Sequence, residues 1–98
     1  MKMMENQIEK FLRTGTATIV DVRTPAEYSG GHVHGSINIP LQELSGRMDE
    51  LKTMQNIVVC CASGGRSHMA ATWMQQEGMP VMDGGSWLSV NNLINSGR

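Results

Sequence analysis

Short runs of apolar residues alternate along this chain with longer stretches in which apolar residues recur at helical spacing. Residues 17–22 and 57–60 are the clearest runs, and both are short and rich in β-branched side chains, which predicts buried strands. A stretch with helical signals follows each of them. Such alternation favours an α/β domain built on a parallel sheet.

Capping and turn residues place the remaining elements. Asn6, with Glu9 three residues later, is typical of a helix N-terminus, and Gly15 suits the end of that helix. Pro25 suits the first position of a helical turn over residues 24–28. A brief strand is predicted at residues 36–38, followed by two short helices within residues 41–51 that separate at Ser45 and Gly46. Later in the chain, the pattern predicts a helix from about residue 67 to residue 77 and a short strand at residues 80–82. A final helix, which Ser86 caps, is predicted to run to residue 94.

Composition narrows the function mainly by exclusion. The length of 98 residues predicts a single domain over residues 1–98, and eight basic against nine acidic residues give a formal net charge of −1. No run of basic residues indicates a nucleic-acid partner. Residues 1–6 lack the apolar stretch of a signal peptide, and no segment approaches the roughly 20 apolar residues of a membrane span. We therefore expect a cytoplasmic protein with no membrane partner.

The two cysteines, Cys60 and Cys61, are adjacent in the sequence. They cannot form a disulfide across the fold within one chain, and a zinc site with four ligands would need several histidines beside them. His32 and His34 have the spacing of a metal-binding pair, but no carboxylate cluster accompanies them. We therefore expect neither a metal nor a cofactor, and the adjacent thiols point to cysteine reactivity instead.

A loop of small residues follows the strand at residues 57–60 and leads directly into a helix. Glycines in such a loop let successive backbone N–H groups converge on one point, and the helix N-terminus adds positive potential there. A thiol at this point is stabilised as the thiolate, which lowers a cysteine pKa from about 8.5 to roughly 3.5–7.5. Each feature alone is common, but their order at the carboxyl end of a parallel strand favours a functional site. The predicted site consists of the nucleophile Cys61 and the anion-binding residues Ala62, Ser63, Gly64, Gly65, Arg66 and Ser67.

Two spacings to Arg66 compete for the choice of nucleophile. Cys60 continues the apolar run of the strand, which indicates a side chain in the core. Cys61 is the first residue of the predicted turn, with four residues between it and Arg66. Five residues separate Cys60 from Arg66, which is the spacing of cysteine phosphatases, although Val59 stands where tyrosine phosphatases have His. The pattern favours sulfur chemistry at Cys61 and leaves a phosphatase as the alternative.

Four segments resemble the rhodanese domain family: residues 19–28, 31–40, 61–67 and 83–85, in the family's order and across nearly the whole chain. The resemblance implies an α/β, three-layer rhodanese-like fold with a parallel sheet of about five strands flanked by helices. It also implies transfer of sulfane sulfur from a donor such as thiosulfate to a thiophilic acceptor such as cyanide or a thiol.

The mechanism that the resemblance implies is a two-step exchange through a Cys61 persulfide. The N–H groups of residues 62–67 would hold the persulfide, and Arg66 would orient an anionic donor. The partners are a small-molecule sulfur donor and a thiol or cyanide acceptor, or the cysteine of a partner protein. Two other classes remain open, namely a non-catalytic rhodanese-like binding module and a phosphatase or arsenate reductase that uses the same anion-binding loop.

Other matched residues suggest supporting roles. We expect an Arg23–Glu27 ion pair to fix the turn after the first strand, with Asp21 bonded to nearby backbone. We expect His32 to anchor its loop and His68 to lie exposed, near the rim of the site.

Two positions depart from the family pattern. Many family members have Tyr or Phe where Cys60 stands, and a vicinal thiol could resolve the persulfide as a disulfide. Trp87 follows Gly85 more closely than is usual in the family, which concerns the shape of the pocket wall rather than the loop.

Overall fold

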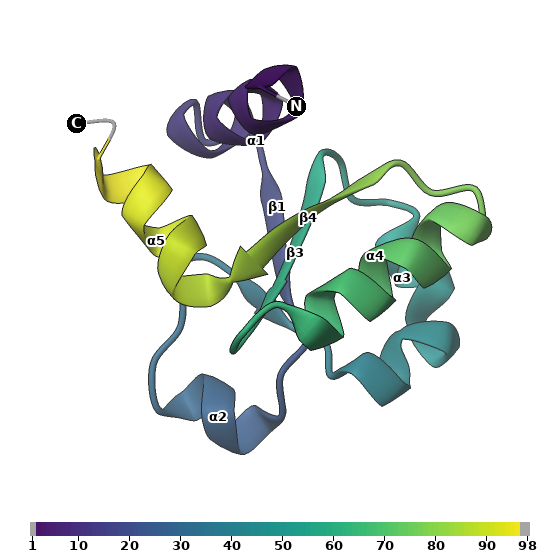
Figure 1. The fold of residues 1–98 in the computed structure, drawn as a ribbon. Helices are drawn as coiled ribbons and strands as arrows, with labels where there is room; N and C mark the ends of the chain where they lie inside the picture. The colour runs from purple at the N-terminus through teal and green to yellow at the C-terminus, as the bar shows by residue number, and fades with distance from the viewer. Residues whose placement is uncertain (1, 97–98) are drawn as a thin grey trace.

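The computed structural model describes the backbone of residues 2–96 and the side chains of residues 7–95. The described part of the chain holds a four-stranded parallel sheet in the order β2-β1-β3-β4 (Figure 1). The predicted parallel α/β fold is confirmed, with four strands rather than five. Its elements in chain order are α1 (Lys2–Arg13), β1 (Thr18–Asp21), α2 (Pro25–Ser29), β2 (Ile37–Asn38), the 3-10 helix η1 (Leu41–Arg47), α3 (Met48–Leu51), β3 (Ile57–Cys61), α4 (Gly65–Gln76), β4 (Val81–Ser86) and α5 (Trp87–Ser96).

Helices cover the sheet on both sides, so the domain has three layers. In Figure 1, α1 and α5 lie on one side of the strands, and α3 and α4 lie on the other. Each side has its own hydrophobic core. The first core packs Leu12 of α1 and Val90 of α5 on the sheet, and the second packs Leu51 of α3 and Met74 of α4 on it.

The central strand β3 supplies residues to both cores in alternation. Val59 and Cys61 belong to the core under α4, whereas Val58 and Cys60 belong to the core under α1 and α5. All five residues of β3 are buried. The period of two in a strand therefore decides which layer each cysteine enters.

The turn after β1 forms as its capping residues predict. The Thr24 hydroxyl accepts a hydrogen bond from the Glu27 N–H, and the Glu27 carboxylate accepts one from the Thr24 N–H. This is a capping box, with Pro25 at the first helical position. It fixes α2 at the carboxyl end of β1, the edge of the sheet at which β3 also ends.

Several boundaries differ from the prediction. Helix α1 begins at Lys2, so Asn6 lies within the helix rather than at its cap. Ser45 and Gly46 continue the 3-10 helix η1, and the break falls at Arg47, where φ is −124° and ψ is 24°. The end of β4 lies at Ser86 rather than near residue 82, because pairing with β3 continues through a register shift.

Gly84 explains how the last strand passes so close to its neighbours. A Cβ atom at this position would lie 2.7 Å from Val58 Cγ1 and 2.8 Å from Val90 Cγ2. The absent side chain lets β4 pack between β3 and α5. Among residues 2–96, no helix combines the length and apolar character needed to cross a bilayer.

Candidate active site

The site is built at the junction of β3 and α4. Cys61 is the last residue of β3 rather than the first of the turn, and α4 begins at Gly65. Gly64 has a φ of 106°, in the left-handed region that favours glycine, and it makes the turn from strand to helix within three residues. The chain therefore wraps around the Cys61 side chain as soon as the strand ends.

Backbone N–H groups point at the Cys61 sulfur. The N–H of Gly64 donates to Cys61 Sγ at 3.0 Å, and the N–H of Ser67, in the first turn of α4, donates to it at 3.2 Å. Two donors from a tight loop and a helix N-terminus thus converge on one atom, as the anion-binding nest requires. Cys61 is buried, while Ala62, Ser63 and Gly65 around it are exposed.

The same contacts control ionisation of Cys61. Burial raises the pKa of this thiol, but hydrogen bonds from Ser67 and from the backbone of Gly64 and Ser63 outweigh burial and bring the pKa below its ordinary value. The loop therefore stabilises a thiolate, which is the nucleophilic form of cysteine.

Cys60 has the opposite environment. Its side chain is fully buried among apolar residues of the α1 and α5 layer, including Ile19, Val58 and Val90. Burial, with a smaller contribution from the Asp21 carboxylate, raises the pKa of the Cys60 thiol to about 12. The prediction that Cys60 is a core residue is confirmed.

Asp83 of β4 holds the start of α4, a role that the sequence did not reveal. The Ser67 hydroxyl lies 2.7 Å from Asp83 Oδ1 and 3.1 Å from the Gly64 carbonyl oxygen. The Gly85 N–H donates to the same Asp83 oxygen at 3.0 Å. Asp83 therefore ties β4 to Ser67, whose N–H contacts the sulfur. Residues 83–85 form one of the segments that resemble the family, but the contact between Asp83 and Ser67 arises only when β4 pairs with β3.

Arg66 forms a two-point ion pair across the mouth of the loop. Its Nη1 lies 2.7 Å from Glu27 Oε1, and its Nη2 lies 2.9 Å from Glu27 Oε2. The predicted Arg23–Glu27 ion pair is therefore wrong, because the Glu27 carboxylate faces Arg66 instead. Helix α2 carries Glu27 toward the Cys61 loop, and a pairing over 39 residues cannot be read from local spacing.

The chain matches the family model for the rhodanese-like domain over residues 4–87. This chain belongs to the rhodanese-like domain family. The match covers all four resembling segments, including the site loop, and it agrees with the fold and the order of its elements.

Relatives of this rhodanese-like domain agree with that assignment. The chain is 35% identical over 79 residues to the uncharacterized protein YqhL of Bacillus subtilis, covering 79% of this chain and 63% of that protein. It is 31% identical over 74 residues to a sulfurtransferase of Allochromatium vinosum, covering 76% of this chain and 69% of that protein. A rhodanese-related protein from Thermoplasma volcanium superposes with a TM-score of 0.72 at 31% identity, over 89% of this chain and 85% of that one. Of these three proteins, the one from Allochromatium vinosum is named a sulfurtransferase.

In this rhodanese-like domain, Asp21 and Arg23 form a buried ion pair after β1. Arg23 is 4% exposed and binds both oxygens of the Asp21 carboxylate, the shortest contact being 2.8 Å. Arg23 also donates to the Gly31 carbonyl at 2.7 Å and lies 4.9 Å above the Trp87 ring. Asp21 accepts from the Arg23 N–H at 3.0 Å, so its expected bond to backbone is confirmed. This ion pair joins the end of β1, the following loop and α5.

His32 and His68 of this rhodanese-like domain lie outside the Cys61 loop. His32 Nδ1 lies 2.7 Å from the Tyr28 carbonyl oxygen, and the two rings stack at 3.7 Å, so His32 anchors its loop as expected. The His68 side chain is 77% exposed, with Nδ1 3.7 Å from Asp83 Oδ2. Among the described residues, no group of three or more His, Cys, Asp or Glu side chains has the arrangement of a metal site.

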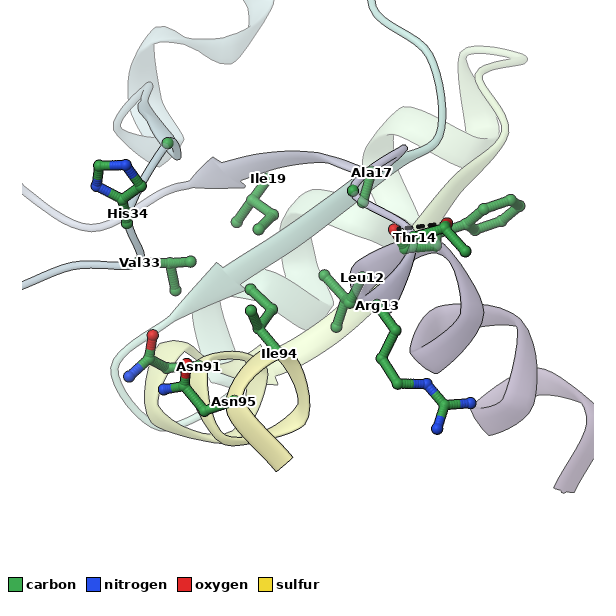
Figure 2. Close-up of a pocket in the computed structure, with 13 residues that line it drawn as sticks. Leu12, Arg13, Thr14, Ala17, Ile19, Val33, His34, Asn91, Ile94 and Asn95 are labelled. Atoms are coloured by element: carbon green, nitrogen blue, oxygen red, sulfur yellow. Dashed lines mark hydrogen bonds between the residues drawn. The ribbon is translucent and has the colours of Figure 1, made fainter. Parts of the chain in front are cut away.

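The hollow shown in Figure 2 is separate from the Cys61 loop. It has a volume of about 490 Å³ and lies where the end of α1, the start of β1, the loop at residues 33–35 and α5 meet. Its lining contains no residue of the segment 61–67. This hollow is therefore distinct from the Cys61 loop.

Proposed function

We propose that this rhodanese-like domain is a sulfurtransferase in which Cys61 carries sulfane sulfur as a persulfide. The observation that supports it most directly is the pair of N–H donors, from Gly64 and Ser67, on Cys61 Sγ. These donors stabilise a thiolate before the reaction and suit the terminal sulfur anion of a persulfide after it. The sulfurtransferase of Allochromatium vinosum among the relatives adds support for the same chemistry.

The proposed reaction has two half-reactions. In the first, the Cys61 thiolate attacks the outer sulfur of a sulfane donor such as thiosulfate, an S–S bond forms at Cys61, and the S–S bond of the donor breaks with its electron pair leaving on sulfite. In the second, cyanide or a thiolate attacks the outer persulfide sulfur and regenerates the Cys61 thiolate. Neither step needs a strong acid, a metal or an external oxidant.

Access to the sulfur constrains the encounter with the donor. Cys61 is buried beneath exposed loop residues, so a donor must reach Sγ through a small displacement of the segment around Ala62 and Ser63. A sulfur covered only by a short exposed loop suits a small sulfur compound and also the cysteine of a partner protein. We propose that residues 1–98 act as one domain in the cytoplasm, where thiols stay reduced.

The phosphatase alternative requires Cys60 as the nucleophile, because only Cys60 has the five-residue spacing to Arg66. Cys60 lies in the opposite layer from the loop, and burial raises the pKa of its thiol to about 12. Both observations disfavour Cys60 as the nucleophile and therefore disfavour the phosphatase alternative. The binding-module alternative predicts that no sulfur is ever loaded.

Intact mass spectrometry tests the proposal directly. The protein is incubated with thiosulfate or with a small persulfide, and one added sulfur atom is expected on the wild type and on Cys60→Ala, but not on Cys61→Ser. Addition of cyanide should remove the sulfur and release thiocyanate. Loss of the adduct in Cys60→Ala with retention in Cys61→Ser would show that Cys60, and not Cys61, carries the sulfur. Absence of any adduct on the wild type with both donors would favour the binding module, and hydrolysis of p-nitrophenyl phosphate would favour the phosphatase.

A further inference from the structure

The Arg66 guanidinium beside the Cys61 loop is already paired with a carboxylate of the same chain, that of Glu27. Both terminal nitrogens of Arg66 contact Glu27, at 2.7 and 2.9 Å, in a two-point arrangement that fixes the guanidinium plane. The Glu27 carboxylate is itself fixed, because its Oε1 accepts from the Thr24 N–H at 3.0 Å within the capping box of α2. Glu27 thus occupies the face of Arg66 that an anionic donor would need.

The other charged groups beside the loop do not supply a replacement cation. Arg23 is buried and bound to both oxygens of Asp21. Asp83 adds a negative charge next to Ser67. Among the described residues, each arginine beside the loop therefore has a carboxylate partner, and His68 Nδ1 lies 3.7 Å from Asp83 Oδ2. The thiolate of Cys61 brings further negative charge.

Donor charge decides how well a sulfane compound can approach this site. Thiosulfate is a dianion, and both of its charges meet the Cys61 thiolate with no unpaired arginine to offset the repulsion. A persulfide in its R–S–SH form carries no charge on the reacting sulfurs. We propose that Glu27 determines donor specificity by neutralising Arg66, so that this site takes persulfide donors, R–S–SH, in preference to thiosulfate.

The persulfide reaction balances without any additional reagent. The Cys61 thiolate attacks the outer sulfur of R–S–SH, a new S–S bond forms at Cys61, and the donor S–S bond breaks with its electron pair leaving on R–S⁻. The products are the Cys61 persulfide and a thiolate, with one negative charge on each side of the equation. Glu27 contacts neither the donor nor the reacting sulfurs, so it acts through Arg66 as a positioning residue.

Ionisation of Glu27 keeps the pairing in place at working pH. The hydrogen bonds from Arg66 and from the Thr24 backbone lower the pKa of Glu27 to about 2. The carboxylate therefore stays charged throughout the neutral range, and Arg66 stays neutralised there.

The inference rests on the proposed function, and Glu27→Gln tests it. A Gln at this position keeps the capping box, because its amide oxygen still accepts from the Thr24 N–H. Its NH₂ group then faces Arg66, so the guanidinium loses its anionic partner and becomes available to thiosulfate. We expect kcat/KM for thiosulfate to rise about fivefold, which is the factor that corresponds to one exposed ion pair at the upper end of measured strengths. With glutathione persulfide as donor, kcat/KM should stay within about twofold of the wild type.

Two control variants separate specificity from structure. Glu50→Gln breaks a matched two-point pair with Arg47, at 2.9 and 3.0 Å, in the η1–α3 segment, and it should change neither rate constant. In the double variant Glu27→Gln/Arg66→Gln, the gain with thiosulfate should disappear because the released cation is absent. A loss of stability alone would lower the rates with both donors together and leave their ratio unchanged.

The outcomes distinguish the specificity role of Glu27 from sulfur transfer at Cys61 itself. A raised ratio of thiosulfate to persulfide kcat/KM in Glu27→Gln, which is lost in the double variant, supports the specificity role. If the wild type already uses thiosulfate as well as glutathione persulfide, or if Glu27→Gln leaves the ratio unchanged, the specificity role is wrong while sulfur transfer stands. If neither donor loads Cys61 in the wild type, the proposed function itself fails.

Discussion

Cys60 and Cys61 are joined by one peptide bond, yet their side chains enter opposite hydrophobic cores of the sheet. The Cys61 sulfur accepts N–H hydrogen bonds from the loop, and the Cys60 sulfur lies among apolar side chains. This geometry gives neighbouring thiols different acidities. It also works against the vicinal disulfide, because both side chains would have to leave their layers to meet.

Alkylation with iodoacetamide should discriminate between the two thiols. Because the pKa of Cys61 is lowered, its alkylation rate should level off at a lower pH than that of a free cysteine, whose pKa is about 8.5. Cys60 should remain unmodified until the protein unfolds, because burial raises the pKa of its thiol to about 12. Peptide mapping after timed alkylation measures both. A Cys61 midpoint at or above that of free cysteine would contradict the role assigned to the loop donors.

Ser67→Ala should raise the pKa of Cys61. The hydroxyl of Ser67 is among the groups that lower this pKa, and it also bonds to Asp83 Oδ1 at 2.7 Å. The alkylation midpoint should therefore move upward, and the free energy of unfolding should fall by about 1 kcal/mol. Ser63→Ala is the matched control, because that side chain is exposed and its N–H is retained. Equal midpoints for the two variants would mean that the Ser67 hydroxyl does not influence the thiolate.

Acid should weaken the fold partly through Glu27. The folded protein lowers the pKa of this carboxyl from its ordinary value of 4.5 to about 2, chiefly through the Arg66 hydrogen bond. The stabilisation is thus fully present above pH 4.5 and is lost as the pH falls through about 2. Urea unfolding at a series of pH values should show a smaller decrease across this window in Glu27→Gln than in the wild type. Parallel curves for the two proteins would show that the ion pair is not linked to folding.

Gly84→Ala should destabilise the domain by about 1–3 kcal/mol, because the added methyl group would overlap Val58 and Val90 in a packed interior. The contacts come from both β3 and α5, so neither neighbour can yield without disturbing the other. Gly46→Ala provides the control, since a Cβ there meets nothing within 4 Å and the φ angle is not positive. Urea midpoints measure both, and a Gly84→Ala variant as stable as Gly46→Ala would show that β4 adapts.

Local sequence signals correctly predicted the strand, turn and helix that carry the site. The β-branched run at residues 57–60 predicted β3, and the small residues after it predicted the turn into α4. The alternation of side chains along a strand separated Cys60 from Cys61 correctly. These features depend on neighbours in the chain, which is why they could be read from it.

The contacts that complete the site depend on tertiary packing and were missed. Glu27 was expected to pair with Arg23, four residues away, but α2 directs it to Arg66. Arg23 instead turns back to Asp21 beneath the Trp87 ring. Such choices among several nearby charges depend on where helices lie, and no spacing rule contains that information.

The two oxygens of the Glu27 carboxylate have different hydrogen-bond partners. Oε1 accepts from the Thr24 N–H and hydroxyl as well as from Arg66, whereas Oε2 accepts from Arg66. The contacts that cap the first turn of α2 therefore do not depend on Arg66. A displacement of the loop that admits a donor to Cys61 would thus leave the cap of α2 intact, and α2 would still present Glu27 to Arg66 when the loop returns.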